Sequence, residues 1–156
     1  EEIARKKVFD MGCGRGEVAR FLSVKGCQVL SADYSLAACK RFHEVNMAEL
    51  PFIRHDLSKG MPWIQNDYFD LVVLADVVEH VYKDQLEVIG QDAVRVAKHG
   101  GLILIDTPIM NGGESELHVD IKASAQEVHN FFKGTELLGT HWHKKPEHCN
   151  IILRKI

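Results

Sequence analysis

Short apolar runs alternate with amphipathic stretches along the first half of the chain. The runs lie at residues 7–11, 28–33, 52–56 and 70–76, and turn signals or helix-start signals follow them. After the second run, for example, Ser35 is a typical N-cap for a helix that reaches about residue 45. The fourth run, DLVVLAD, is apolar almost throughout, as are strands that a parallel sheet buries on both faces. The pattern predicts repeated strand–helix units.

The alternation continues past the middle of the chain. Apolar residues at 86–97 recur at intervals of three and four, which predicts a helix with one buried face. Asp84 with Glu87 is a plausible cap at its start, and the glycines after His99 are typical of a helix end. A fifth strand is expected at 102–106, directly after these glycines.

The last part of the chain departs from this alternation. Ser124 and Glu127 have the spacing of a capping box, which predicts a helix. Two strand-like runs then follow, at 136–143 and 149–155, and a turn joins them as in a hairpin. Five strand–helix units that end in a hairpin predict an α/β fold, a doubly wound and mostly parallel sheet with one antiparallel strand. We expect residues 1–156 to form a single domain.

Composition and charge exclude several classes of protein. The 156 residues are 46% hydrophobic and 26% charged, which is ordinary for a globular domain, and no apolar run approaches the ~20 residues that span a bilayer. The net charge of −3 gives no basic surface for nucleic acid. The four cysteines form no CxxC pair and no signal peptide precedes them, so we expect reduced thiols in a cytoplasmic protein.

The candidate chemistry lies where predicted strands end, because doubly wound sheets bind ligands beyond the carboxyl ends of their strands. The first end carries Gly12, Gly14 and Gly16, which bring the backbone close to a ligand and present amides at a helix N-terminus. Asp33 ends the second strand, where a carboxylate can accept hydrogen bonds from both ribose hydroxyls. Asp56 ends the third, in a place suited to an adenine amino group. The GxGxG spacing differs from the GxGxxG of dinucleotide folds.

Together these segments resemble the class I S-adenosylmethionine-dependent methyltransferases. VFDMGCGRG, SADYS, HDLS, DLVVLADVVEHV and HGGLILIDTP are similar to the successive motifs of that family, over almost the whole chain. The resemblance implies a Rossmann-like sheet of seven strands in the order 3-2-1-4-5-7-6, with strand 7 antiparallel. It also implies S-adenosyl-L-methionine as cofactor. The cofactor-binding residues that it implies are Asp10, Gly12, Cys13, Gly14, Gly16, Asp33, Tyr34, Asp56, Leu57 and Ala75.

The segment DVVEH, residues 76–80, adds a second set of candidates. On a helical turn, Asp76, Glu79 and His80 would share one face at the mouth of the cleft. Similar segments accompany a divalent metal in the ubiquinone-pathway O-methyltransferases and the small-RNA 2′-O-methyltransferases, and in the latter a further histidine follows strand five, where His118 is the match. The resemblance implies a Mg²⁺ or Mn²⁺ site of Asp76, Glu79, His80 and His118. Two alternatives are open: Glu79, His80 and His118 as proton acceptors or substrate contacts, or a purely structural segment.

The sequence therefore predicts a methyltransferase that uses S-adenosyl-L-methionine. The acceptor that it favours is an oxygen of a small molecule, or of a glycan or lipid precursor. One alternative is a small-RNA 2′-O-methyltransferase domain, against which the acidic charge balance argues. Another is a non-catalytic subunit that binds the cofactor beside a catalytic partner. Neither the acceptor nor the oligomeric state follows from the sequence.

Overall fold

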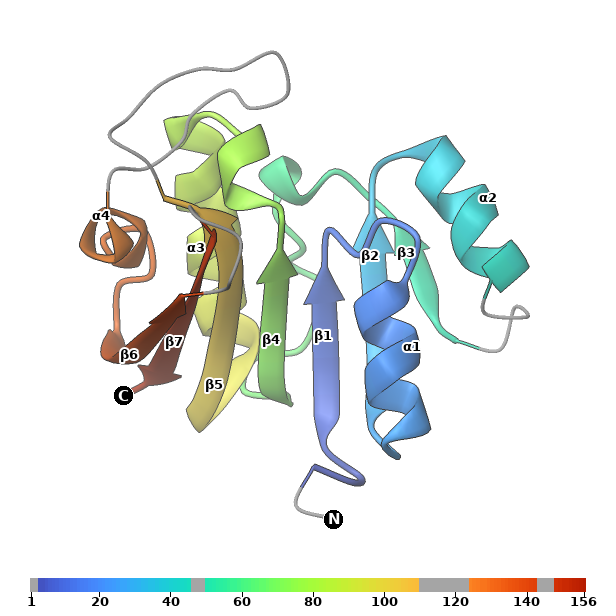
Figure 1. Cartoon of the computed structure of the whole chain (residues 1–156), viewed down its shortest axis with the longest axis horizontal. Helices are drawn as coiled ribbons and strands as arrows, with labels where there is room; N and C mark the ends of the chain where they lie inside the picture. The colour runs from blue at the N-terminus through green and yellow to red at the C-terminus, as the bar shows by residue number, and fades with distance from the viewer. Residues whose placement is uncertain (1–2, 46–49, 110–123, 143–147) are drawn as a thin grey trace.

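A computed structural model describes residues 3–45, 50–109, 124–142 and 148–156 of the chain (Figure 1). Its strands are β1 Lys7–Met11, β2 Gln28–Asp33, β3 Phe52–Arg54, β4 Phe69–Ala75, β5 Ala97–Pro108, β6 Thr135–Trp142 and β7 His148–Lys155. Its helices are α1 Glu17–Val24, α2 Leu36–Val45, α3 Lys83–Val96 and α4 Ala125–His129, with two 3-10 turns, η1 Leu57–Lys59 and η2 Val78–His80.

The strands form one sheet of the predicted topology. Their order is β3-β2-β1-β4-β5-β7-β6. The pairs from β3 across to β5 are parallel, whereas β7 runs antiparallel to both of its neighbours, β5 and β6. The predicted fold class and strand order are therefore confirmed.

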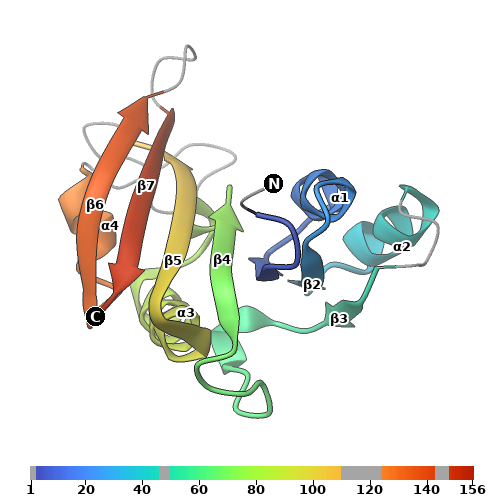
Figure 2. The same ribbon diagram turned by 90° about the horizontal axis from the view of Figure 1, so that it is seen from below.

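Helices cover the sheet on both faces, with α1 and α2 on one side and α3 on the other (Figure 2). Successive residues of the central strands point to opposite faces, and this alternation divides the core into two clusters. Val8 and Val73 pack into the smaller cluster, with residues of α1 and α2. Phe9 and Val72 pack into a much larger cluster, with residues of α3 and the segment that includes α4. The apolar core on the α3 face of the sheet thus contains many more buried side chains than the core on the α1 and α2 face.

The start of α3 differs from the sequence prediction. The helix begins at Lys83, and the backbone N–H of Tyr82 donates a hydrogen bond to Gln85 Oε1 at 2.9 Å. The prediction that Asp84 with Glu87 forms the cap was therefore wrong. Glutamine can close a capping contact as glutamate does, and this one lies two residues earlier in the chain.

The end of α3 also differs from the prediction. Val96 is the last helical residue, and Ala97 already belongs to β5, so the glycines that were expected to end the helix lie inside a strand. Gly100 has a φ of 73°, and the pairing of β4 with β5 shifts register between Phe69 and Leu71. Such a bulge takes up the extra residues without breaking the strand.

The C-terminal elements agree with their sequence signals. Ser124 Oγ accepts a hydrogen bond from the backbone N–H of Glu127 at 3.1 Å, which is the predicted cap of α4. The predicted hairpin is formed by β6 and β7. Within the described ranges, no helix has the length and apolar character needed to cross a membrane.

Candidate cofactor and active site

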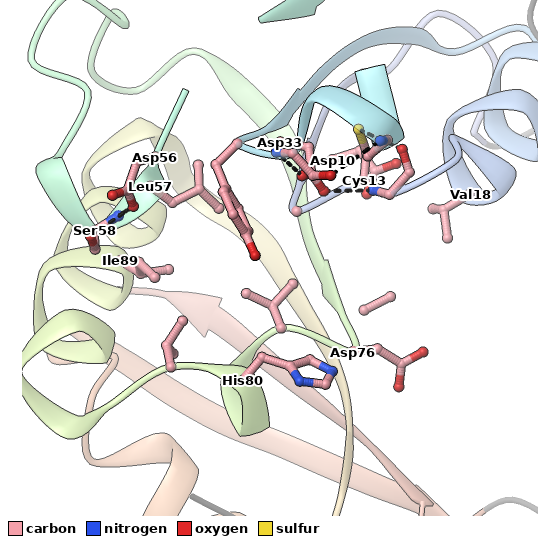
Figure 3. A pocket seen from close by; sticks show the side chains of 18 of the residues that line it. Asp10, Cys13, Val18, Asp33, Asp56, Leu57, Ser58, Asp76, His80 and Ile89 are labelled. Atoms are coloured by element: carbon pink, nitrogen blue, oxygen red, sulfur yellow. Dashed lines mark hydrogen bonds between the residues drawn. The ribbon is translucent and has the colours of Figure 1, made fainter. Parts of the chain in front are cut away.

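A cavity of about 950 Å³ opens at the carboxyl ends of the parallel strands (Figure 3). Asp10 and Asp33 lie on one side of it, and Asp76 and His80 lie across from them. Nine of the ten residues predicted to bind the cofactor line this cavity: Asp10, Gly12, Cys13, Gly14, Asp33, Tyr34, Asp56, Leu57 and Ala75. The tenth, Gly16, is the N-cap of α1. Sequence reasoning thus selected residues that the fold brings together.

The glycine loop between β1 and α1 needs its glycines for backbone shape and for space. Gly12, Gly14 and Gly16 have φ values of 78°, 52° and 82°, a region that residues with a Cβ rarely adopt. A Cβ on Gly12 would also lie 2.5 Å from Val77 Cγ2. The backbone N–H groups of Gly12 and Cys13 both donate to the Ala32 carbonyl, at 2.8 and 3.0 Å, and so fix the loop to the end of β2.

Asp33 is held in place by two backbone hydrogen bonds. Its Oδ2 accepts from the N–H of Gly14 at 2.9 Å, and its Oδ1 accepts from the N–H of Ser35 at 2.8 Å. The carboxylate therefore joins the glycine loop to the start of α2. Each carboxylate oxygen has a second lone pair, so Asp33 can accept further hydrogen bonds from a ligand in the cavity.

Asp56 is held in the ionised state. Its Oδ1 accepts from the Ser58 hydroxyl at 2.7 Å and from the Ser58 N–H at 3.0 Å. The hydrogen bond from the Ser58 side chain is the main cause that lowers the pKa of the Asp56 carboxyl. Asp56 is therefore a hydrogen-bond acceptor at neutral pH, which suits an amino group as its partner.

Among the described residues that line the cavity, Asp10 has the one carboxyl group that is fully buried. It is 1% exposed, and its Oδ2 has no hydrogen-bond partner among the described residues. Its pKa is raised from 3.8 to about 7, mainly by burial and in part by the charge of Asp33, against a backbone hydrogen bond at Ala19. The same burial raises the pKa of the Cys13 thiol, which therefore stays protonated and unreactive. A cationic ligand would supply a partner for Asp10 Oδ2.

We expect the buried Asp10 carboxyl to make the ligand-free protein less stable as pH rises from 4 to 7. The unfolded chain ionises this group near 3.8, whereas the folded chain holds its proton up to about 7, so folding is increasingly disfavoured between these values. The loss corresponds to about 2–4 kcal/mol. Urea denaturation of wild type and Asp10→Asn across this range measures it: the difference in free energy of unfolding should change with pH. A constant difference would contradict the buried, titrating carboxyl.

The segment DVVEH does not form the single helical face that its spacing suggests. Asp76 has a left-handed φ of 53° and precedes η2, whose three residues end at His80. Glu79 points into the core: it is 1% exposed, and its Oε2 accepts a hydrogen bond from Thr107 Oγ1 at 3.0 Å. His80 is about half exposed and lines the cavity. The prediction of a common face was therefore wrong, because a left-handed residue and a 3-10 turn replace the regular α-helical turn.

Glu79 is an unusual carboxyl group. Its pKa is raised to about 7, mainly by burial and in part by the charge of Asp76, against the hydrogen bond from Thr107. Its Oε1 has no hydrogen-bond partner among the described residues, and His80 Nε2 is 4.0 Å away, beyond hydrogen-bond distance. Glu79 thus lies behind the cavity wall while His80 faces into the cavity.

The predicted metal set is only partly described. His118 lies outside the described residues, so the set of Asp76, Glu79, His80 and His118 stays a prediction. Among the residues that the structure does describe, Asp76, Asp106 and His148 are the group of three whose possible ligand atoms all lie within 4.8 Å of one another. Sequence reasoning missed Asp106 and His148. The predicted antiparallel hairpin could have indicated them. The first residues of an antiparallel β7 must lie beside the last residues of β5, at the same end of the sheet.

A family profile described as a methyltransferase domain matches residues 9–105, more than half of the chain. The chain belongs to this methyltransferase domain family, and the predicted family and enzyme class are confirmed.

Two named relatives come from bacterial ubiquinone synthesis. The ubiquinone biosynthesis O-methyltransferase of Pseudomonas syringae pv. tomato is 31% identical over 111 residues, which are 67% of this chain and 45% of that protein. The enzyme of the same name from Nitrosomonas europaea is 28% identical over 107 residues, with the same coverage. The chain therefore spans less than half the length of these relatives.

Solved structures share the fold. An S-adenosylmethionine-dependent methyltransferase from Mesorhizobium loti has a TM-score of 0.82 at 16% identity, over 99% of this chain and 93% of its own. A 1,6-didemethyltoxoflavin-N1-methyltransferase from Burkholderia thailandensis has a TM-score of 0.81 at 13% identity, over 97% of this chain and 72% of its own. At these identities the likeness shows the fold alone, which is Rossmann-like.

Proposed function

We propose that this chain binds S-adenosyl-L-methionine in the cavity and transfers its methyl group to an oxygen of a small molecule, or of a glycan or lipid precursor. The observation that carries the proposal is the row of carboxylates at adjacent strand ends. Asp10 lies near the end of β1, Asp33 is the last residue of β2 and Asp56 follows β3, and all three line one cavity. The names of the relatives from ubiquinone synthesis support oxygen as the acceptor atom.

Each carboxylate suits a different part of the cofactor. The free lone pairs of Asp33 would accept hydrogen bonds from the ribose hydroxyls, while its two backbone bonds hold it in place. Asp56, beside the buried Leu57, would accept from the adenine amino group. Asp10 would give its unpartnered Oδ2 to the positively charged methionine portion, and the ligand would favour the ionised carboxylate. Ala75 and Asp76 would then border the sulfonium.

The transfer itself is an in-line displacement at the methyl carbon. The bond from the acceptor oxygen to that carbon forms as the bond from carbon to sulfur breaks, and S-adenosylhomocysteine leaves. Because the sulfonium is already activated, the protein contributes mainly alignment of the two reactants. A hydroxyl acceptor must also lose its proton, and His80, whose side chain lines the cavity across from Asp10 and Asp33, is the group that we propose to accept it.

Replacing Asp33 with Asn is expected to weaken binding of S-adenosylhomocysteine and S-adenosyl-L-methionine by about 10- to 100-fold. The amide NH₂ would face the N–H of Gly14 or Ser35, so two donors would meet. The ribose would also have one acceptor oxygen fewer, and the loss costs about 1–3 kcal/mol. Calorimetric titration measures this. Glu44→Gln, on the exposed ion pair of α2, is the matched control and should bind as wild type does. Unchanged affinity in Asp33→Asn would refute the placement of the ribose.

A second measurement separates the proposed enzyme from a cofactor-binding subunit without catalysis. The chain is incubated with radiolabelled cofactor and a panel of phenols, sugars, lipid precursors and short RNAs. Methyl transfer to a hydroxyl of the first three classes is the expected outcome. Transfer to RNA alone would overturn the proposed acceptor. Tight cofactor binding with no transfer to any class would overturn the proposed catalysis.

A further inference from the structure

We propose that Asp76, Asp106 and His148 bind one divalent transition-metal ion beside the cavity, near the ends of β4 and β5 and the start of β7. This group shares only Asp76 with the set that the DVVEH motif implies. Binding of the ion stands on the geometry of these three residues. A role for the ion beside the methyl acceptor, by contrast, rests on the proposed function.

The three side chains come from adjacent strands of the sheet. Asp76 follows β4, and its backbone N–H donates a hydrogen bond to the Asp106 carbonyl at 2.9 Å. Asp106 lies on β5 opposite Asn150 of β7. Paired residues of neighbouring strands point to the same sheet face, so Asn150 shares the face of Asp106. His148 is two residues before Asn150 and therefore points to that face too. Backbone pairing therefore holds all three positions close together, and strands are a more rigid support for a site than loops are.

The separations suit ligands of a shared ion better than direct hydrogen bonds. His148 Nδ1 lies 3.8 Å from Asp76 Oδ1 and 3.8 Å from Asp106 Oδ1. Hydrogen bonds between nitrogen and oxygen are about 2.7–3.2 Å long. Two atoms that each bind one ion at about 2.0–2.2 Å can be up to about 4.4 Å apart. The three possible ligand atoms all lie within 4.8 Å of one another, so small side-chain movements would bring them around one ion.

The buried Glu79 is a second observation that points to a cation at this place. Its side chain is 1% exposed, and its Oε1 has no hydrogen-bond partner among the described residues. Its carboxyl group is close enough to Asp76 and His148 to interact with their charges, so two of the three proposed ligands lie near it. A buried carboxylate without a counter-charge is costly, and an ion on the other two carboxylates would supply that charge.

The donor set indicates which ions fit. Two carboxylate oxygens and one imidazole nitrogen favour Mn²⁺, Co²⁺ or Zn²⁺ over ions that prefer oxygen alone, such as Mg²⁺ and Ca²⁺. Three protein ligands leave coordination positions for water or for an oxygen of another molecule. Asp76 itself lines the cofactor cavity, so these positions are next to the place where an acceptor would enter. A bound ion would lower the pKa of an acceptor hydroxyl.

The test is calorimetric titration of the metal-free full chain with MnCl₂, without cofactor. We expect binding of one ion, and we expect Asp106→Asn and His148→Gln each to weaken it by about 10- to 100-fold or more. The matched control is His99→Gln, because His99 Nε2 lies 3.9 Å from Asp67 Oδ1 in a similar but exposed pair. That variant should bind Mn²⁺ as wild type does. Thermal denaturation of the variants checks that they remain folded.

Three outcomes would overturn the proposal. They are no Mn²⁺ binding by the wild type, equal loss in His99→Gln and His148→Gln, or loss in His118→Gln with full binding in His148→Gln. The last outcome would favour the set that the motif implies. Titration of the same samples with S-adenosyl-L-methionine tests the proposed function separately. Mn²⁺ binding that depends on His148, without cofactor binding, would support the metal site and refute the proposed methyl transfer.

Discussion

Replacing His80 with Gln is expected to lower kcat for methyl transfer by about 10²- to 10⁴-fold while cofactor affinity stays close to that of wild type. The polar groups placed to bind the cofactor lie at the ends of β1, β2 and β3, whereas His80 belongs to η2 across the cavity. Its backbone N–H donates to the Val77 carbonyl, and that bond is unaffected by the side chain. The substitution therefore removes a proton acceptor without removing a cofactor contact.

The measurement pairs steady-state kinetics with calorimetric titration of S-adenosylhomocysteine. His99→Gln is a suitable control, because His99 lies near the start of β5, at the opposite end of the sheet. It should change neither kcat nor affinity. If His80→Gln kept full kcat, His80 would not be the proton acceptor. If it lost affinity and kcat in equal proportion, His80 would be a cofactor contact instead.

Replacing Gly90 with Ala is expected to destabilise the fold by about 2–3 kcal/mol, although alanine favours a helix over glycine by about 1 kcal/mol. Gly90 lies in the middle of α3, where a Cβ would overlap the carbonyl oxygen of Phe131 and lie 3.0 Å from its carbonyl carbon. These atoms are backbone, and they cannot rotate away as a side chain can. The neighbouring Phe132 is fully buried, which holds the segment against the helix.

Urea denaturation with and without the substitution measures this cost as a change in midpoint. Gly139→Ala on β6 is the matched control, because a Cβ there meets no atom within 4 Å. Its free energy of unfolding should stay within about 0.5 kcal/mol of wild type. A Gly90→Ala protein that is as stable as wild type, or more stable, would show that the close approach of the Phe131 backbone to α3 is wrong.

The sequence was sufficient for the sheet and for one side of the cavity. Buried parallel strands appear in the sequence as uninterrupted apolar runs. The residue that ends such a run therefore lies at the carboxyl end of its strand, where ligands of these sheets bind. Asp33 and Asp56 could therefore be identified from their positions alone, whereas Asp10 was implied by the family resemblance. Their hydrogen bonds to nearby backbone groups are also local, since the partners of Asp33 and Asp56 lie in adjacent loops or within two residues.

The other side of the cavity could not be predicted in the same way. Helical spacing placed Glu79 beside His80 on one face, but the left-handed backbone of Asp76 changes the direction of the segment, and Glu79 turns toward Thr107. The nearness of His148 to Asp106 depends on the register of an antiparallel pair far apart in sequence. No local pattern carries that register, because it is set by how whole strands pack.

The unequal division of the core has a consequence for how the protein responds to its ligand. Few side chains pack beneath α1 and α2, whereas the face under α3 has a much larger apolar cluster. Local opening requires less free energy where fewer apolar contacts are lost, so amide hydrogens of α1 and α2 should exchange with solvent sooner than those of α3. The glycine loop and Asp33 join these two helices to the cavity. A ligand bound in the cavity would therefore stabilise α1 and α2, the less stable half of the fold, and slow the exchange of their amide hydrogens.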